Sequence, residues 1–273
     1  PEDVLHAFGM SVYGAMAPMV GHPNSPVIME PIFAIDMHVR ALSTASLGAM
    51  ANIMRATHLD EAIFASLCRE SDMYHVLQRC AILLSRMALT MPPPMFHDMV
   101  RATASWPDLC RRLISTSATL SHARSRKLVA LGLAHMLRHA SAQDKGLLSA
   151  VPDMIGMWTE VVGEVVEDEA GSADRYEREL SPTRALEIGE DGIPFLDEFG
   201  LIEAAPTPSS ARTDAVRSRD PSFNVPLRAY VADTLNAVLQ NGSYKTQLQS
   251  LLATIDPLVL DTLQRGLSER PVA

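Results

Sequence analysis

The stretch MYHVLQRCAILLSRMALTMPPPMFHDMV, residues 73–100, decides the fold class of this chain. Pro92–Pro94 interrupt it, and because proline breaks a helix interior but is tolerated in a first helical turn, a second helix is expected to start there. The stretch therefore predicts a helix, a tight turn and another helix. On both sides of the prolines the apolar residues recur three and four positions apart, the spacing of one helix face; they are Met73, Val76, Leu77, Cys80, Leu83, Leu84 and Met87, then Met95, Phe96, Met99 and Val100.

The same helical spacing continues toward both ends of the chain, and no alternating strand pattern is found. Asp144 is expected to cap one helix, and Pro152 is expected to kink or split it. The helix pairs repeat about every forty residues, as in HEAT or armadillo arrays. Each amphipathic pair leaves an apolar face that only a neighbour can bury, which favours an all-α solenoid of HEAT-like antiparallel pairs over a closed bundle. The further helices are expected over residues 3–19, 34–56, 106–114, 121–140, 144–166, 225–240 and from Asp256 to Gly266.

The helical pattern stops at about residue 168. Fourteen acidic residues lie between Glu160 and Glu203 against three arginines, and a Pro/Ser-rich stretch follows. Such a composition buries too little apolar surface to offset the entropy of ordering. We therefore expect HEAT-like repeats over 1–167, a mostly disordered acidic insertion over 168–222, and closing helices of the same solenoid over 223–273.

The totals and motifs argue for a binding protein rather than an enzyme. The net charge is −9, which disfavours direct nucleic-acid binding, and no apolar run reaches the length of a membrane span. The common phosphate-binding, nucleophile and zinc motifs are missing. His135 and His139 share a helix face, but a metal needs further ligands, so we interpret them as surface or interface residues. We expect no metal and no cofactor, and we interpret Cys68, Cys80 and Cys110 as buried apolar residues.

The acidic insertion is the best candidate for function. It is either a solubilising linker or an electrostatic contact for a basic partner, because like charges attract the opposite charge and speed association. Arg124, Arg126 and Lys127 form a smaller basic cluster, which is either a solvated face or a contact for an acidic partner. The candidate partner-binding residues of the acidic segment are Glu167, Asp168, Glu169, Glu190, Asp191, Phe195, Asp197, Glu198 and Phe199.

Four stretches resemble the C-terminal region of the importin-β superfamily of nuclear transport receptors, and the importin-eleven type in particular. In that region a Trp-containing helix is followed by a linker of variable length, then by an Asp-Pro pair and a helix with Leu and Tyr-Val. Asp220, Pro221, Leu227, Tyr230 and Val231 fit this pattern. The stretches are LQRCAILLSRMALTMPPPMFHDMV (77–100), RKLVALGLAHML (126–137), MWTEVVGEVVED (157–168) and DPSFNVPLRAYVADTLNAVLQ (220–240).

The resemblance implies a HEAT stack that carries protein cargo through nuclear pores under the control of the GTPase Ran, and the acidic insertion would suit a basic cargo. Family members bind Ran chiefly through N-terminal repeats that this chain lacks. Because the chain begins with Pro1, we expect it to be a fragment of a longer protein or a processed product. Nucleoporins would be further partners, and the protein would shuttle between cytoplasm and nucleus. The alternative is a cytosolic HEAT scaffold or regulatory subunit without Ran dependence. An all-α enzyme is a third hypothesis, for which no site constellation is found.

Overall fold

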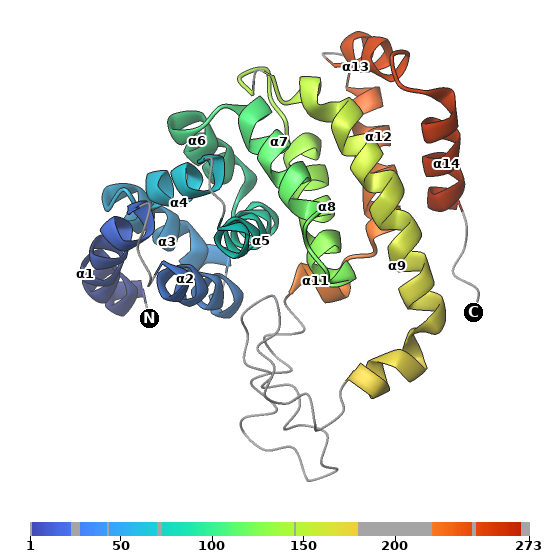
Figure 1. Cartoon of the computed structure of the whole chain (residues 1–273). Coiled ribbons are helices and arrows are strands. Elements are labelled where there is room, and N and C mark those ends of the chain that lie inside the picture. The colour runs from blue at the N-terminus through green and yellow to red at the C-terminus, as the bar shows by residue number, and fades with distance from the viewer. Residues whose placement is uncertain are drawn as a thin grey trace.

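The computed structural model describes residues 2–22, 28–42, 44–69, 73–144, 146–179, 220–241 and 244–268. Within these ranges the chain consists of α-helices, one short 3-10 helix and connecting turns, and it contains no strand (Figure 1). The predicted all-α fold is confirmed. The helices are α1 Glu2–Gly21, α2 Met29–Ala41, α3 Thr44–Ala56, α4 Leu59–Cys68, α5 Tyr74–Thr90, α6 Pro93–Thr103, α7 Trp106–Ser117, α8 Ala123–Arg138, α9 Val151–Glu179, α11 Pro221–Asn224, α12 Leu227–Gln240, α13 Lys245–Leu252 and α14 Pro257–Ser268.

The helices stack in two rows, which run from α1 at one end to α14 at the other (Figure 1). In the first row α2 contacts α5, α5 contacts α8, and α8 contacts α12. In the second row α1 contacts α4, α4 contacts α7, α7 contacts α9, and α9 contacts α14. The rows are joined by contacts such as α4 with α5 and α8 with α9. Stacked pairs that touch only their neighbours are what defines a solenoid, so the predicted solenoid is confirmed as well.

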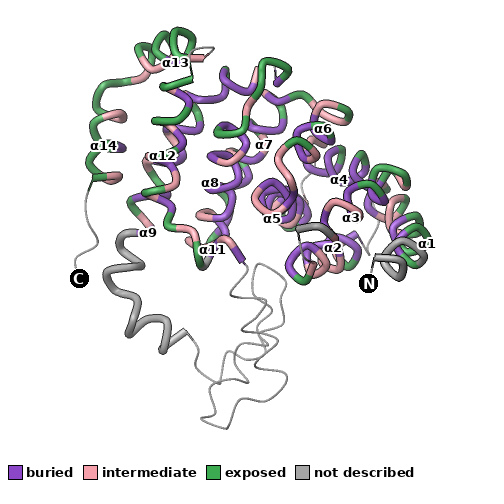
Figure 2. Tube along the Cα trace, turned by 180° about the vertical axis from the view of Figure 1, so that it is seen from behind, coloured by how far each residue is buried: buried purple, intermediate pink, exposed green. Residues whose placement is uncertain are grey.

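The central helices of the first row are buried on nearly all sides (Figure 2). Every residue of α5 from Cys80 to Ala88 is buried, and so is every residue of α8 from Leu128 to Ala134. A helix that is buried all round needs neighbours on several sides, and α5 contacts α2, α4, α7 and α8. At the crossing of α5 and α8, a Cβ on Gly132 would lie 2.8 Å from the Cβ of Ser85, so only glycine permits this close approach.

Both tryptophans are packing anchors. Trp158 on α9 is 0 % exposed and its Nε1 donates to the backbone oxygen of Ala130 on α8, at 3.1 Å. Trp106 at the start of α7 is also buried. The cysteines are free: Cys80 and Cys110 are buried, and burial raises the pKa of both thiols to about 12. Cys68 is only half-buried, so for this residue the expectation of full burial is wrong.

The boundaries of the acidic insertion differ from the expected range 168–222. Helix α9 continues to Glu179, so its backbone is helical over the first twelve residues of that range. At the other end, Asp220 and Ser222 are buried at the start of α11. Residues 180–219 lie outside the described residues. The insertion therefore separates α9 of the second row from α12 of the first row.

In the region before α9, Pro152 splits the expected element instead of kinking a helix. A 3-10 helix over Leu148–Ala150 comes first, and Pro152 lies in the first turn of α9, where its missing N–H is harmless. Asp144 does not cap this helix. Its buried carboxylate instead binds side chains of the preceding repeat.

Candidate partner-binding site

The structure leaves the nine predicted partner-binding residues untested. Glu167, Asp168 and Glu169 lie on the helical backbone of α9, but their side chains are outside the described part of the molecule. The other six also lie outside the described residues; they are Glu190, Asp191, Phe195, Asp197, Glu198 and Phe199. Their role in binding therefore stays a prediction. The described residues show how the acidic segment is connected to the helices at its start and at its end.

At the start of the acidic stretch, α8 and α9 are joined by ion pairs of Arg126. Its guanidinium donates from Nη2 to Glu160 at 3.1 Å and from Nη1 to Glu164. The Arg126 side chain is 14 % exposed, whereas Glu160 is 65 % exposed. The sequence offered two interpretations of this arginine, a solvated face or a contact for an acidic partner. Instead it pairs with the acidic residues that follow it in the same chain.

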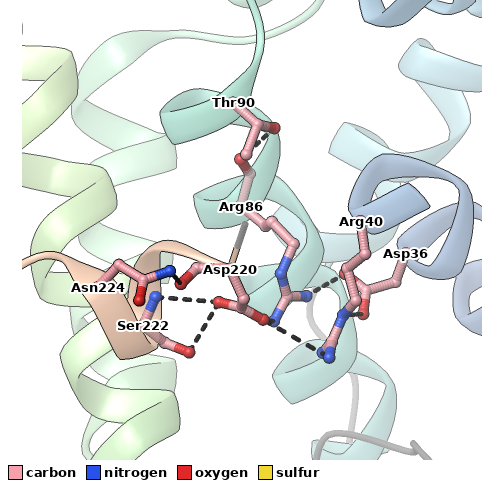
Figure 3. Close-up of polar contacts among 7 residues, drawn as sticks. All are labelled: Asp36, Arg40, Arg86, Thr90, Asp220, Ser222 and Asn224. Carbon is pink, nitrogen blue, oxygen red and sulfur yellow. Dashed lines mark hydrogen bonds and ion pairs between the residues drawn. The ribbon is translucent and has the colours of Figure 1, made fainter. Parts of the chain in front are cut away.

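At the end of the insertion, Asp220 enters a buried ion-pair cluster formed by three helices (Figure 3). Its Oδ2 accepts from Nη2 of Arg86 on α5 at 3.2 Å and lies 3.6 Å from Nη1 of Arg40 on α2. Asp36 on α2 accepts from Arg86 and, at 3.0 Å, from Nε of Arg40. All four side chains are at most 6 % exposed. We call these residues the arginine–aspartate cluster: Asp36, Arg40, Arg86 and Asp220.

The second oxygen of Asp220 stabilises the turn in which the residue lies. Its Oδ1 accepts from the backbone N–H of Ser222 at 2.9 Å and from the Ser222 hydroxyl at 2.7 Å. This is the bonding of an N-cap residue. Burial works to raise the pKa of Asp220, but the charges of Arg86 and Arg40 and the hydrogen bonds of Ser222 outweigh it, and the pKa lies below its usual value. Asp220 is therefore ionised at neutral pH.

Asp144 is the centre of a second buried polar cluster, which joins α6, α7 and the loop after α8. It accepts from Nδ1 of His97 at 2.9 Å, from Nη1 of Arg101 at 3.0 Å and from Nε1 of Trp106 at 3.1 Å. The backbone N–H of Ser141 donates at 2.7 Å. A surface hollow of about 470 Å³ lies beside it, lined by Pro93, Pro94, His97, Arg101, His139, Ser141, Ala142, Gln143 and Asp144.

Of the two histidines that share a helix face, His135 lies at the interface of α8 with α12, and His139 lies directly after the end of α8. Nδ1 of His135 is hydrogen-bonded to the hydroxyl of Tyr230, and the ring of His139 lies 4.4 Å from that of His135. The guanidinium of Arg138 lies 5.5 Å from the centre of the Tyr230 ring. Their interpretation as surface or interface residues thus holds: His135 lies at the interface and His139 is exposed. The described residues include no group of three or more His, Cys, Asp or Glu placed to hold a metal ion.

The arginine–aspartate cluster was missed from the sequence, although a signal for it exists. Arg86 lies within the mainly apolar run AILLSRMAL of α5, and a charged residue in such a position is rarely buried without a partner. Asp220 was recognised only as part of a sequence pattern. What the sequence could not supply is the pairing of the two residues, because 133 residues lie between them.

The described clusters therefore form joints between neighbouring repeats. No helix in the described ranges is both long and apolar enough to cross a membrane.

Comparison with known proteins identifies the family. The chain matches the family model described as importin-11-like, TPR repeats, over residues 1–268. Neither the curated proteins nor the solved structures gave a match. A TPR repeat, like a HEAT repeat, is a pair of helices that stacks on its neighbours, so the family model agrees with the two rows of helices. The chain belongs to the importin-11-like family of helical-repeat proteins.

Proposed function

We propose that this chain is the C-terminal part of a nuclear transport receptor, which binds protein cargo for passage through the nuclear pore under the control of Ran. The observation that carries this proposal is the family match over residues 1–268. A stack of helix pairs suits the role, because each repeat adds surface and extended binding faces result. Transport of this kind works by reversible binding, without covalent chemistry.

The acidic segment after α9 is proposed as the contact for a basic stretch of cargo. It concentrates fourteen carboxylates between Glu160 and Glu203 against three arginines. Such a concentration of like charge attracts basic partners over roughly 10 Å at 0.1 M salt, and the attraction weakens as salt rises. Phe195, Leu196 and Phe199 would add an apolar contact within the acidic stretch.

Ran and nucleoporins are the further partners that the family suggests, with shuttling between cytoplasm and nucleus. We assign Ran to repeats of the parent protein other than those present in this chain. A cytosolic scaffold with the same fold is the second candidate. It would bind its partners stably and would be indifferent to Ran.

A pull-down distinguishes the two functions. The full-length parent protein is immobilised and exposed to nuclear extract, with and without excess Ran locked in its GTP-bound state. Release of bound proteins by Ran-GTP supports a receptor for import, and the released proteins identify the cargo. Partners that stay bound in equal amount in both samples would contradict the transport proposal and favour the scaffold.

A further inference from the structure

We propose that the surface hollow between α6 and the loop after α8 binds a lysine side chain of a partner protein, with the ammonium group bonded to Nε2 of His97. The partner is thus a basic protein segment that presents a lysine to the hollow. The inference rests on the proposed transport function only in that a basic cargo would supply such a segment. It would give the repeat stack a structured contact in addition to the acidic segment after α9.

The buried ring of His97 provides a hydrogen-bond acceptor that no described group uses. The residue is 3 % exposed, and its Nδ1 lies 2.9 Å from Oδ2 of Asp144. Burial works to raise the pKa of Asp144, but the hydrogen bonds of Ser141 and His97 outweigh it, so the carboxylate is ionised and only accepts. The proton of the neutral ring is therefore on Nδ1, and Nε2 carries a lone pair. Among the described residues nothing donates to this buried atom, which is unfavourable.

The charges around the hollow select a cation as the ligand. Arg101 lines the hollow and is paired with two carboxylates, those of Asp98 and Asp144. Burial lowers the pKa of His139 at the rim, so this ring adds no charge at neutral pH. The described residues thus leave one net negative charge; the neighbouring Lys145 is not among them. An anion would meet this charge and the lone pair of the histidine, whereas a positively charged donor is attracted by both.

The walls of the hollow favour lysine among the cationic side chains. Pro93, Pro94 and Ala142 provide apolar surface, along which the carbon stem of a lysine can lie. The volume of about 470 Å³ is within the range of roughly 300–1,000 Å³ that ligand sites occupy. An ammonium group is a compact donor that suits a single nitrogen, while the planar fork of arginine fits a free carboxylate. Both oxygens of the buried Asp144 carboxylate are already bonded.

The first test uses the wild-type chain and two small probes. One is Nα-acetyl-lysine methylamide, and the other is the same compound with its side-chain amine acetylated, which removes the charge. Long-range proton–nitrogen NMR spectra resolve the two ring nitrogens of each histidine. We expect the lysine probe to shift the Nε2 signal of His97 up to saturation, and the acetylated probe to leave it unchanged. This signal reports on the hollow alone, so weak attraction of the probe to the acidic segment does not affect it.

Two variants then test the acceptor and the charge, with the Kd read from the backbone amide signal of Ala142. His97→Asn keeps a donor in place of Nδ1 and removes Nε2, so the Kd of the lysine probe should rise about tenfold or more. Asp98→Asn removes an exposed charge and should raise the Kd about two- to fivefold. Asp261→Asn on α14 is the matched control and should leave the Kd unchanged. Like Asp98, Asp261 is 54 % exposed and paired with an arginine of its own helix.

The proposal is overturned if neither probe shifts the Nε2 signal, or if the acetylated probe shifts it as strongly as the lysine probe. It is equally overturned if a folded His97→Asn chain binds the lysine probe with the Kd of the wild-type chain. Binding of an O-phosphoserine amide in place of the lysine probe would show that the hollow takes anions, and would also overturn it. None of these measurements involves Ran, so the hollow and the transport function can fail independently.

Discussion

Arg86 on α5 and Asp220 at the start of α11 form a buried ion pair with 3.2 Å between Nη2 and Oδ2, although 133 residues separate them in the sequence. Their side chains are 3 % and 2 % exposed. The pair fixes the place where the chain returns to the first row after residues 180–219. It also connects α11 to α2, because both residues pair with side chains of that helix.

Breaking this pair should destabilise the fold strongly. Arg86→Met and Asp220→Asn each remove one partner of a buried ion pair, which costs about 3–5 kcal/mol. The double variant should lose less than the sum of the two, by about 0.5–3 kcal/mol, because neither partner of the pair is then left without the other. Urea unfolding followed by circular dichroism gives the free energies of unfolding of the wild-type chain, the two single variants and the double variant, which together form a double-mutant cycle.

The matched control is the pair of Asp261 and Arg265 on α14, whose side chains are 54 % and 67 % exposed. Asp261→Asn should cost less than about 1 kcal/mol, since exposed ion pairs contribute little. An additive cycle for Arg86 and Asp220 would show that the buried pair is not coupled as the structure indicates.

The fold could be predicted from the sequence because helical periodicity is a local property. The apolar residues from Met73 to Val100, three and four apart around three prolines, correctly indicated α5, the turn and α6. The stop of α12 before Asn241 was also predicted. The end of α9 at Glu179 was not predicted. The sequence of residues 168–179 has no apolar periodicity by which a helix could be distinguished from an acidic linker.

The polar joints could not be predicted, because they depend on which repeats become neighbours. Asp144 has the sequence context of a helix cap, yet three side chains from α6 and α7 turn toward it. The position of these donors follows from the stacking angle of the repeats, and no single helix encodes that angle. The contacts of Asp220 could not be predicted for the same reason, since Arg40 and Arg86 come from two other helix pairs.

The close crossing of α5 and α8 predicts that Gly132→Ala is destabilising. The added Cβ would lie 2.8 Å from the Cβ and 2.9 Å from the Cα of Ser85, so the two helices must move apart. Overpacking of this kind costs about 1–3 kcal/mol. Gly163→Ala in α9 is the control, because its Cβ would meet nothing within 4 Å. It should instead stabilise the helix by about 0.5–1 kcal/mol. Thermal unfolding compares the two; equal changes in Tm would contradict the crossing.

The histidine at the interface of α8 and α12 predicts a loss of stability in mild acid. Burial, helped by the charges of His139, His97 and Arg138, lowers the pKa of His135 to about 4 from 6.5. Below pH 6.5 the unfolded chain therefore binds a proton that the folded chain does not. Stability should fall between pH 6.5 and 4, by roughly 1–3 kcal/mol in total, and this contribution should level off below pH 4.

The variant His135→Gln should flatten this dependence, measured as the free energy of unfolding in urea at pH 7.5, 6.5, 5.5 and 4.5. His58→Asn is the control. Hydrogen bonding to the exposed Glu61, with its charge, raises the pKa of His58, so its contribution has the opposite sign. Asparagine also tolerates the positive φ of 56° at this position. If His135→Gln has the same pH slope as the wild-type chain, the interface histidine is not the cause.

The proposed role of the acidic segment predicts that its charges and its aromatic rings contribute differently to cargo binding. Neutralising Glu190, Asp191, Asp197 and Glu198 to Gln or Asn should weaken binding of a basic cargo at 50 mM salt several-fold. It should also flatten the dependence of Kd on salt, because attraction between charges is screened as salt rises. Replacing Phe195 and Phe199 by Ser should weaken binding by a similar factor at low and high salt, since apolar contacts are not screened. Isothermal titration of the full-length parent at 50 and 300 mM salt measures both effects. If the variant with the four neutralised carboxylates has an unchanged Kd at 50 mM salt, the segment does not bind the cargo and acts as a solubilising linker.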